Sequence, residues 1–215
     1  MQPAPVLEKH LVFKPIVTGQ GDGKGAAAGK TGMQTVEQKK LQETAKGDLF
    51  YVQIIGDGKT KEGNNDAAKW SIQFRDLPEV VQKRPVTSRL VADIPIVDSD
   101  PITAMAGLGY SYKSSYYLTG HRFTHLNTSL LLIKAVMPQT GESPEHVSDS
   151  EDVVNGQLVD PSGSYLIQAS IRVQDGSKVE LMNRATAELM NLKETLKGVV
   201  DLEVGDRLAM DTRVR

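Results

Sequence analysis

The stretch 21–32, GDGKGAAAGKTG, contains the first residues whose types and spacing could do chemistry. It ends in Gly29, Lys30 and Thr31, the ending of the loop that cradles nucleotide phosphates with successive backbone N–H groups. Lys24 stands where that loop requires its first glycine, and segment 35–46 has almost no large apolar residues with which to bury a helix face. We therefore interpret the stretch as a linker rich in Gly, Ala and Lys.

Two histidines four residues apart, His121 and His125 in HRFTH, could form a metal-binding pair. A metal site needs further ligands, and no nearby acidic residue is obviously placed to supply one. We expect the two histidines to line a polar strand face instead. The chain has no cysteine, which excludes disulfides, thiolate metal sites and a cysteine nucleophile.

Two other kinds of site remain as alternatives. A metal-dependent triphosphate hydrolase built in a tunnel-like barrel needs alternating glutamates along a strand, and no strand candidate contains an E-x-E row. An RNA-binding module needs exposed aromatic rings on which bases can stack. Most of the one aromatic cluster shares a strand face with Leu118, which favours core packing; its members are Tyr110, Tyr112, Tyr116 and Tyr117.

The charge balance gives no global reason to expect a nucleic-acid or membrane partner. The formal net charge is −2, and the basic group Lys83, Arg84 and Arg89 is small enough to be ordinary solvated surface. No apolar run approaches the roughly 20 residues that cross a bilayer as a helix. We expect a soluble, intracellular protein without direct membrane or nucleic-acid contact.

Period-two alternation dominates the chain outside three polar stretches, 18–47, 56–69 and 139–163. Such alternation is typical of half-buried antiparallel strands. The expected strands are 7–17, 48–55, 70–77, 85–97, 110–119, 122–137, 165–173 and 198–204. We predict a mostly β (α+β) fold, an antiparallel β-barrel of about eight strands in a single domain over 1–215, with flexible inserts at 18–47 and 139–163.

The alternation also predicts which side chains point inward. In WSIQFR, Trp70, Ile72 and Phe74 share one face, opposite Gln73 and Arg75. In GYSYKSSYYLTG a strict alternation places Tyr110, Tyr112, Tyr116 and Leu118 together. We expect the apolar rows to fill the barrel interior, leaving polar residues outside.

Two helices are predicted. Ser177 and Glu180 fit a capping box at the start of a long amphipathic helix over 177–197, and Gly198 is placed to end it. Its apolar stripe consists of Met182, Ala185, Leu189, Leu192 and Leu196. A short helix is expected near 101–107, with Pro101 at its start.

Five segments follow one another along the chain: HLVFKP, WSIQFRDLPE, RPVTSRLVADIPI, GLGYSYKSSYYLTGHRFTHLNTSLLLIKAV and SYLIQASIRVQDGSKVELMNRATAELMNLKETLKGVVDLEVGDRL. In this order they resemble the family of subunit 18 of the Mediator complex of RNA polymerase II transcription, and most of all its filamentous-fungal members. The resemblance implies a β-barrel in the Mediator head module, no enzymatic activity, no cofactor and a nuclear location. It also implies a heterodimer with the similar subunit 20 and docking of the C-terminal helix of subunit 8.

One departure concerns the start of the chain. Members of that family have an additional strand and helix before the block that contains His10, whereas nine residues precede it here. We expect a truncated start rather than a shortened fold, because a barrel without that strand would leave an edge exposed.

Tyr117 and Phe123 are the residues that we expect at a partner interface. Both are aromatic residues on the otherwise polar face of their strand, where an exposed ring would serve as an anchor for a protein partner. Beside the interaction subunit, the triphosphate hydrolase and the RNA-binding module stay as alternatives.

Overall fold

The computed structural model describes residues 3–16, 49–57, 70–79, 85–96, 100–138 and 156–214. The predicted insert 18–47, including the stretch 21–32, and most of the other two polar stretches lie outside these ranges. In chain order the elements are β1 (Ala4–Pro15), β2 (Val52–Asp57), β3 (Ser71–Arg75), β4 (Val91–Pro95), α2 (Pro101–Gly107), β5 (Tyr110–His125), β6 (Thr128–Met137), β7 (Gln157–Leu158), β8 (Leu166–Ser170), α4 (Val179–Leu196) and a 3-10 helix (Leu208–Met210).

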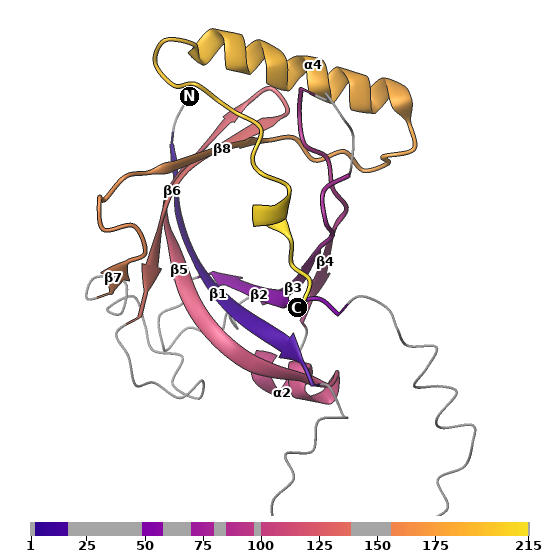
Figure 1. Ribbon diagram of the computed structural model, residues 1–215, viewed down its shortest axis with the longest axis vertical. Coiled ribbons are helices and arrows are strands. Elements are labelled where there is room, and N and C mark those ends of the chain that lie inside the picture. The colour runs from indigo at the N-terminus through magenta and orange to yellow at the C-terminus, as the bar shows by residue number, and fades with distance from the viewer. Residues whose placement is uncertain are drawn as a thin grey trace, which may run out of the picture.

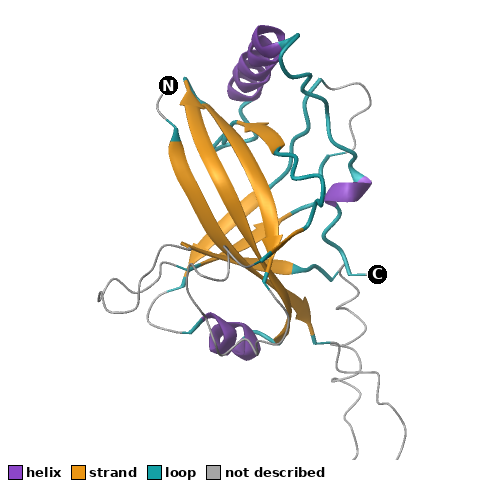
Figure 2. Ribbon diagram, turned by 90° about the vertical axis from the view of Figure 1, so that its left-hand side faces the viewer, coloured by secondary structure: helices purple, strands orange, loops and turns teal. Residues whose placement is uncertain are grey.

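The eight strands form one curved antiparallel sheet, as Figures 1 and 2 show. The strand order is β4-β3-β2-β1-β5-β6-β7, and β8 pairs with β6 beside β7. Among the described residues β4 pairs only with β3, so the sheet does not close into a ring. The predicted antiparallel fold of about eight strands with two helices is confirmed, and it takes the form of an open half-barrel.

The main apolar core lies on the outer side of the curve, between the sheet and α2 (Figure 1). The Asp100 carboxylate begins α2 by accepting hydrogen bonds from the backbone of Ile102 and Thr103, and Pro101 is the first helical residue, as predicted. The buried core residues are Leu11, Phe13, Val52, Ile54 and Met105. Four of these side chains come from β1 and β2 and pack against Met105 of the short helix, which provides the main hydrophobic stabilisation of the outer face.

A row of polar residues lines the inner, concave face. Burial lowers the pKa of the Arg75 guanidinium, while Tyr116 and Glu8, which lie three and two strands away from it, act to raise that pKa. Side chains so far apart along a sheet come this close only where the sheet curves towards them. The expectation that apolar rows fill the interior is therefore wrong: the apolar row of β1, β2 and β3 faces α2, and the polar row faces inward.

A long hairpin joins β5 and β6. The two strands turn at Leu126 and Asn127, and Leu126 adopts the left-handed backbone conformation with φ 53°. Glu188 of α4 fixes this turn, because its carboxylate accepts hydrogen bonds from the Asn127 backbone at 2.7 Å and side-chain amide at 3.0 Å. The predicted strand 122–137 is thus divided between two strands.

The long helix α4 occupies the predicted range but begins differently. Ser177 does not form the predicted capping box; its hydroxyl donates to Asp175 at 2.6 Å, and the helix start has no side-chain cap. The helix ends as predicted, with Gly198 in a left-handed conformation with φ 85°. The predicted strand 198–204 is wrong, since residues 200–204 find no neighbouring strand with which to pair.

Gly56 of β2 tests the packing on the outer face. A Cβ atom at this position would lie 2.4 Å from the Trp70 ring, whereas at Gly107 in α2 it would meet no atom within 4 Å. We expect Gly56→Ala to lower the free energy of unfolding by about 1–3 kcal/mol through overpacking. The matched variant Gly107→Ala should leave it unchanged or raise it slightly, and urea denaturation of both variants checks this. Equal stability of both variants would contradict the packing described here.

Candidate interaction surfaces

Tyr117 does not lie on an exposed polar face, because a β-bulge reverses the alternation of β5. Val12 pairs with Ser114 while the next residue, Phe13, pairs with Tyr112, so Lys113 is an extra residue in the ladder. Beyond the bulge every side chain changes face relative to a strict alternation. Tyr117 consequently shares a face with Tyr112 and is 2% exposed, with the Lys9 ammonium 5.2 Å from its ring centroid.

Phe123 lies further along the same face and is only half-buried. It pairs with Leu130 of β6, which in turn pairs with Ala169 of β8, so the three side chains form an apolar row across the end of the sheet. His121 and His125 are exposed on this face. No group of three His, Asp or Glu side chains in the described ranges could hold a metal ion. The role of Phe123 at an interface remains a proposal.

The tyrosine cluster is not an exposed stacking platform. Tyr110 and Tyr112 pack against the outer core, and Tyr112 meets Phe13 edge-to-face with ring centroids 6.0 Å apart. Tyr116 points to the concave side, where its ring stacks on His10 at 4.8 Å. The bulge therefore separates rings that the sequence suggested would share one face.

On the concave face, a chain of polar contacts links the two ends of the half-barrel. Arg172, which follows β8, donates to the Asp93 carboxylate of β4 at 2.6 Å. The Gln73 amide donates to the other Asp93 oxygen at 2.6 Å, and the Gln73 oxygen accepts from Nε of Arg75. Gln73 is buried despite its polarity because both of its amide groups find partners. An ion pair thus connects the two ends where strand pairing is missing.

A second group surrounds Glu8 in β1. Its carboxylate contacts His10 Nε2 at 3.3 Å and accepts from Arg122 at 3.1 Å. The hydrogen bond with His10 lowers the pKa of Glu8, against the opposing effect of burial, and the charges of His10 and Arg122 lower it further. Burial raises the pKa of the neighbouring Tyr116 hydroxyl.

This arrangement does not suit metal-dependent hydrolysis of a triphosphate. Glu8 and Asp93, the carboxylates of the two contact groups, are each engaged by cationic side chains. Such hydrolysis requires several carboxylates converging on metal ions, and the described residues contain no group able to hold one. The polar contacts seen on the concave face connect strands of the sheet to one another.

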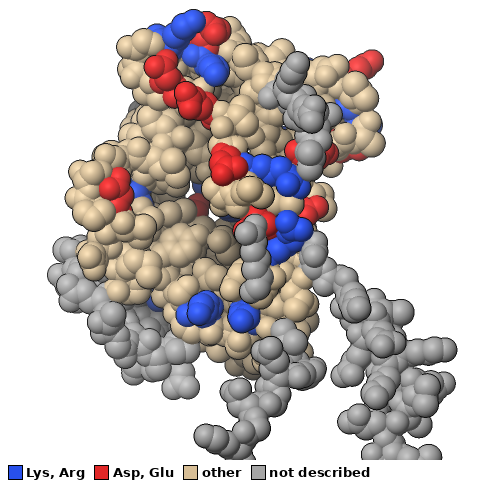
Figure 3. All heavy atoms as spheres, in the orientation of Figure 1, with Lys and Arg blue, Asp and Glu red and all other residues tan. Residues whose placement is uncertain are grey.

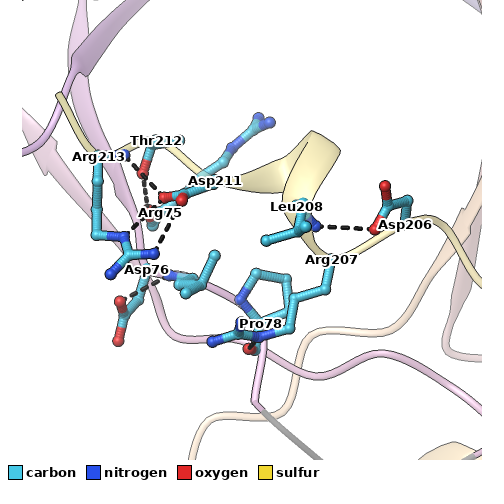
Figure 4. Close-up of polar contacts among 10 residues, drawn as sticks. Arg75, Asp76, Pro78, Asp206, Arg207, Leu208, Asp211, Thr212 and Arg213 are labelled. Atoms are coloured by element: carbon cyan, nitrogen blue, oxygen red, sulfur yellow. Dashed lines mark hydrogen bonds and ion pairs between the residues drawn. The ribbon is translucent and has the colours of Figure 1, made fainter. Parts of the chain in front are cut away.

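The C-terminal segment 206–214 crosses the open side of the half-barrel (Figures 1 and 4). Its backbone pairs with residues 49–51 through Tyr51 N–H to Thr212 at 2.7 Å and Val214 N–H to Leu49 at 2.6 Å. The Thr212 hydroxyl also donates to the Arg75 carbonyl at 2.9 Å. Figure 3 shows basic and acidic side chains of both signs gathered where this segment passes. The sequence signal for it was weak, because its residues follow neither a strand nor a helix period.

Several large apolar side chains remain exposed near the long helix. They are Leu126 at the hairpin turn, Val179 and Leu181 at the start of α4, and Val199 and Val204 after it. Within α4 only Leu192 is fully buried, so most of the predicted apolar stripe is half-buried. No helix of the described ranges is both long and apolar enough to cross a membrane. Exposed apolar residues at both ends of α4 and at the hairpin turn are available for contact with another protein.

Comparison with known proteins identifies the family. The family model described as "Med18 protein" matches residues 1–213, which is nearly the whole chain. The chain belongs to the Med18 family. The resemblance seen in the five sequence segments is therefore confirmed.

Individual relatives agree with this assignment. The chain is 33% identical over 244 residues to Mediator of RNA polymerase II transcription subunit 18 from Coccidioides immitis and 30% identical over 245 residues to that of Aspergillus niger; in both cases the match covers 100% of this chain and 90% of the relative. The Saccharomyces cerevisiae subunit 18 is 29% identical over 76% of this chain and 50% of its own length.

A solved structure shares the fold. A chain of the Schizosaccharomyces pombe Mediator head module superposes with a TM-score of 0.68 over 95% of this chain and 86% of its own length, at 14% identity. At that identity the match supports the fold alone. The half-barrel with its flanking helices is thus a fold that this chain shares with a component of that head module.

The buried position of Tyr117 has a measurable consequence. We expect Tyr117→Ala to lower the free energy of unfolding by about 3–5 kcal/mol, because it leaves a cavity in a packed face. Tyr165 provides the matched control, because its side chain is 50% exposed and contacts the Lys134 ammonium, which lies 4.1 Å from the ring centroid. Tyr165→Ala should cost less than about 1 kcal/mol in the same urea titration. A Tyr117→Ala variant as stable as the wild type would show that the ring is not buried.

The Glu8 contacts predict a dependence of stability on pH. Because the Glu8 pKa is lowered in the folded chain, its ionised carboxylate stabilises the fold above the unfolded-state pKa of about 4.3. That contribution disappears as the pH falls through the lower, folded-state pKa. Glu8→Gln should therefore lose less melting temperature than the wild type between about pH 5 and pH 3. The exposed-site variant Glu203→Gln should follow the wild-type curve; overlapping curves for all three proteins would contradict the prediction.

Proposed function

We propose that this protein is a non-catalytic structural subunit of the Mediator head module, acting in the nucleus by binding other Mediator subunits. The observation that carries the proposal is the family match over residues 1–213. The structure supports it in two ways: the concave face lacks a metal-binding carboxylate group within the described ranges, and apolar side chains are exposed around α4. A subunit of this kind helps to couple regulators to RNA polymerase II.

Two specific partners belong to the proposal. We infer that the half-barrel forms a heterodimer with Mediator subunit 20 and also binds the C-terminal helix of subunit 8. Support comes from the family assignment and from the exposed apolar side chains of Leu126, Val179 and Leu181, each of which is available to a protein partner. Polymerase contact would be indirect.

Co-expression with subunit 20 and the C-terminal segment of subunit 8 tests this function. We expect the three chains to elute together in size-exclusion chromatography, and we expect no release of phosphate from triphosphate RNA with magnesium or manganese. Elution of this chain alone would overturn the proposed assembly. Metal-dependent phosphate release would favour the hydrolase instead.

Phe123 provides a finer test within the same complex. We expect Phe123→Ala to weaken capture of the partners about tenfold while changing the melting temperature of the isolated chain little, because its ring is only half-buried. His121→Ala, an exposed position on the same face of β5, is the control and should retain capture. A large drop in melting temperature for Phe123→Ala would place its ring in the core.

A further inference from the structure

Three arginines lie near one another on the concave side of the half-barrel, where Arg75 interacts electrostatically with both Arg89 and Arg172. Arg75 ends β3, Arg89 precedes β4 and Arg172 follows β8. Asp93, paired with Arg172 at 2.6 Å, is the one carboxylate within ion-pair distance of any of them among the described residues. Arg75 contacts only a neutral acceptor with its side chain, the Gln73 amide oxygen, so its two terminal nitrogens have no hydrogen-bond partner in that part of the chain.

The backbone holds Arg75 and Arg89 near one another. Asp76 N–H donates to the Leu90 carbonyl at 3.0 Å, which fixes the segment containing Arg89 beside the end of β3. Burial lowers the pKa of Arg89, and the positive charge of Arg75 lowers it further. Burial likewise lowers the pKa of Arg75, with Arg172 adding to the repulsion. Like charges held together in partial burial are stabilised when an anion binds between them.

Unused polar atoms lie beside this group. His10 is 1% exposed, and its Nδ1 has no hydrogen-bond partner among the described residues. The buried side-chain oxygen of Gln53 likewise has no partner among them. The His10 ring stacks on Tyr116, whose hydroxyl is hydrogen-bonded to Gln53 and lies close enough to Arg75 for the two groups to interact electrostatically. Buried polar atoms of native proteins nearly always have partners, so these two atoms are available to hydrogen-bond a polar ligand.

We propose that the cluster of Arg75, Arg89 and Arg172 binds the dianionic phosphate group of a phosphate monoester. The nearby Glu8 carboxylate is paired with Arg122, so three guanidinium charges against the Asp93 carboxylate leave an excess of two positive charges, which matches a phosphate monoester near neutral pH. Guanidinium groups also present paired N–H donors at the spacing of phosphate oxygens. Arg172 is 76% exposed at the edge of the half-barrel, so the phosphate can be attached to a larger molecule.

Thermal unfolding of the full chain tests the site. Inorganic phosphate at about 20 mM, exchanged for chloride at constant ionic strength, should raise the melting temperature by about 3 °C if binding is millimolar. We expect Arg75→Gln to abolish this rise and Arg172→Gln to reduce it, while Arg184→Gln on the exposed face of α4 retains it. General salting-out by phosphate acts on all variants alike and cannot produce this difference.

Two further probes distinguish the sources of the phosphate group. A phosphoserine peptide that binds at least tenfold more tightly than inorganic phosphate, and loses this binding in Arg75→Gln, supports a phosphorylated protein; the same behaviour of adenosine monophosphate supports a nucleotide. An equal response of wild type and Arg75→Gln to all three probes overturns the site. The test needs only this chain, so its failure leaves the proposed assembly in Mediator unaffected.

Discussion

Strand β1 is hydrogen-bonded along both edges, and every other part of the sheet is positioned relative to it. Its partners come from distant parts of the chain. Residues Glu8 to Phe13 of β1 pair with β2, and the full length of β1 pairs with β5. The strands β2, β3 and β4 extend the sheet on one side, and β5, β6, β7 and β8 extend it on the other. Because β1 is shared, the side chains of its two faces determine what packs outside the curve and what lines the inside.

The two faces of β1 are stabilised by different interactions. Leu11 and Phe13 bury apolar surface against α2 and neighbouring strands, so the outer face is stabilised mainly by the hydrophobic effect. Glu8 and His10 face inward, where desolvated polar groups cost free energy unless they are hydrogen-bonded. The contacts from Arg172 through Asp93 to Gln73 meet that requirement for the buried Gln73, and they also connect strands that the backbone ladder leaves apart.

The sequence predicts the elements better than it predicts their orientation. Period-two alternation and the Pro101 start located most strands and α2, and the apolar stripe with Gly198 located α4, because these signals are local. Alternation defines two faces but does not say which is concave. Gln73, on the polar side of WSIQFR, is buried only because Asp93 and Arg75 lie beside it in space. The prediction that Tyr117 is exposed failed for another reason. The bulge that buries its ring comes from the extra residue Lys113, and a bulge of this kind has no signature in a single sequence.

The absence of pairing between β4 and the β7–β8 end, among the described residues, gives this sheet a freedom that a complete ring lacks. In a ring, strand number, stagger and tilt determine one another, so one added strand forces all the others to shift. Here an extra strand, from elsewhere in this chain or from another polypeptide, could attach to the outer edge of β4 while the ladder around β1 keeps its register. The half-barrel can therefore be extended by a strand at one edge without any change in the pairing of its central strands.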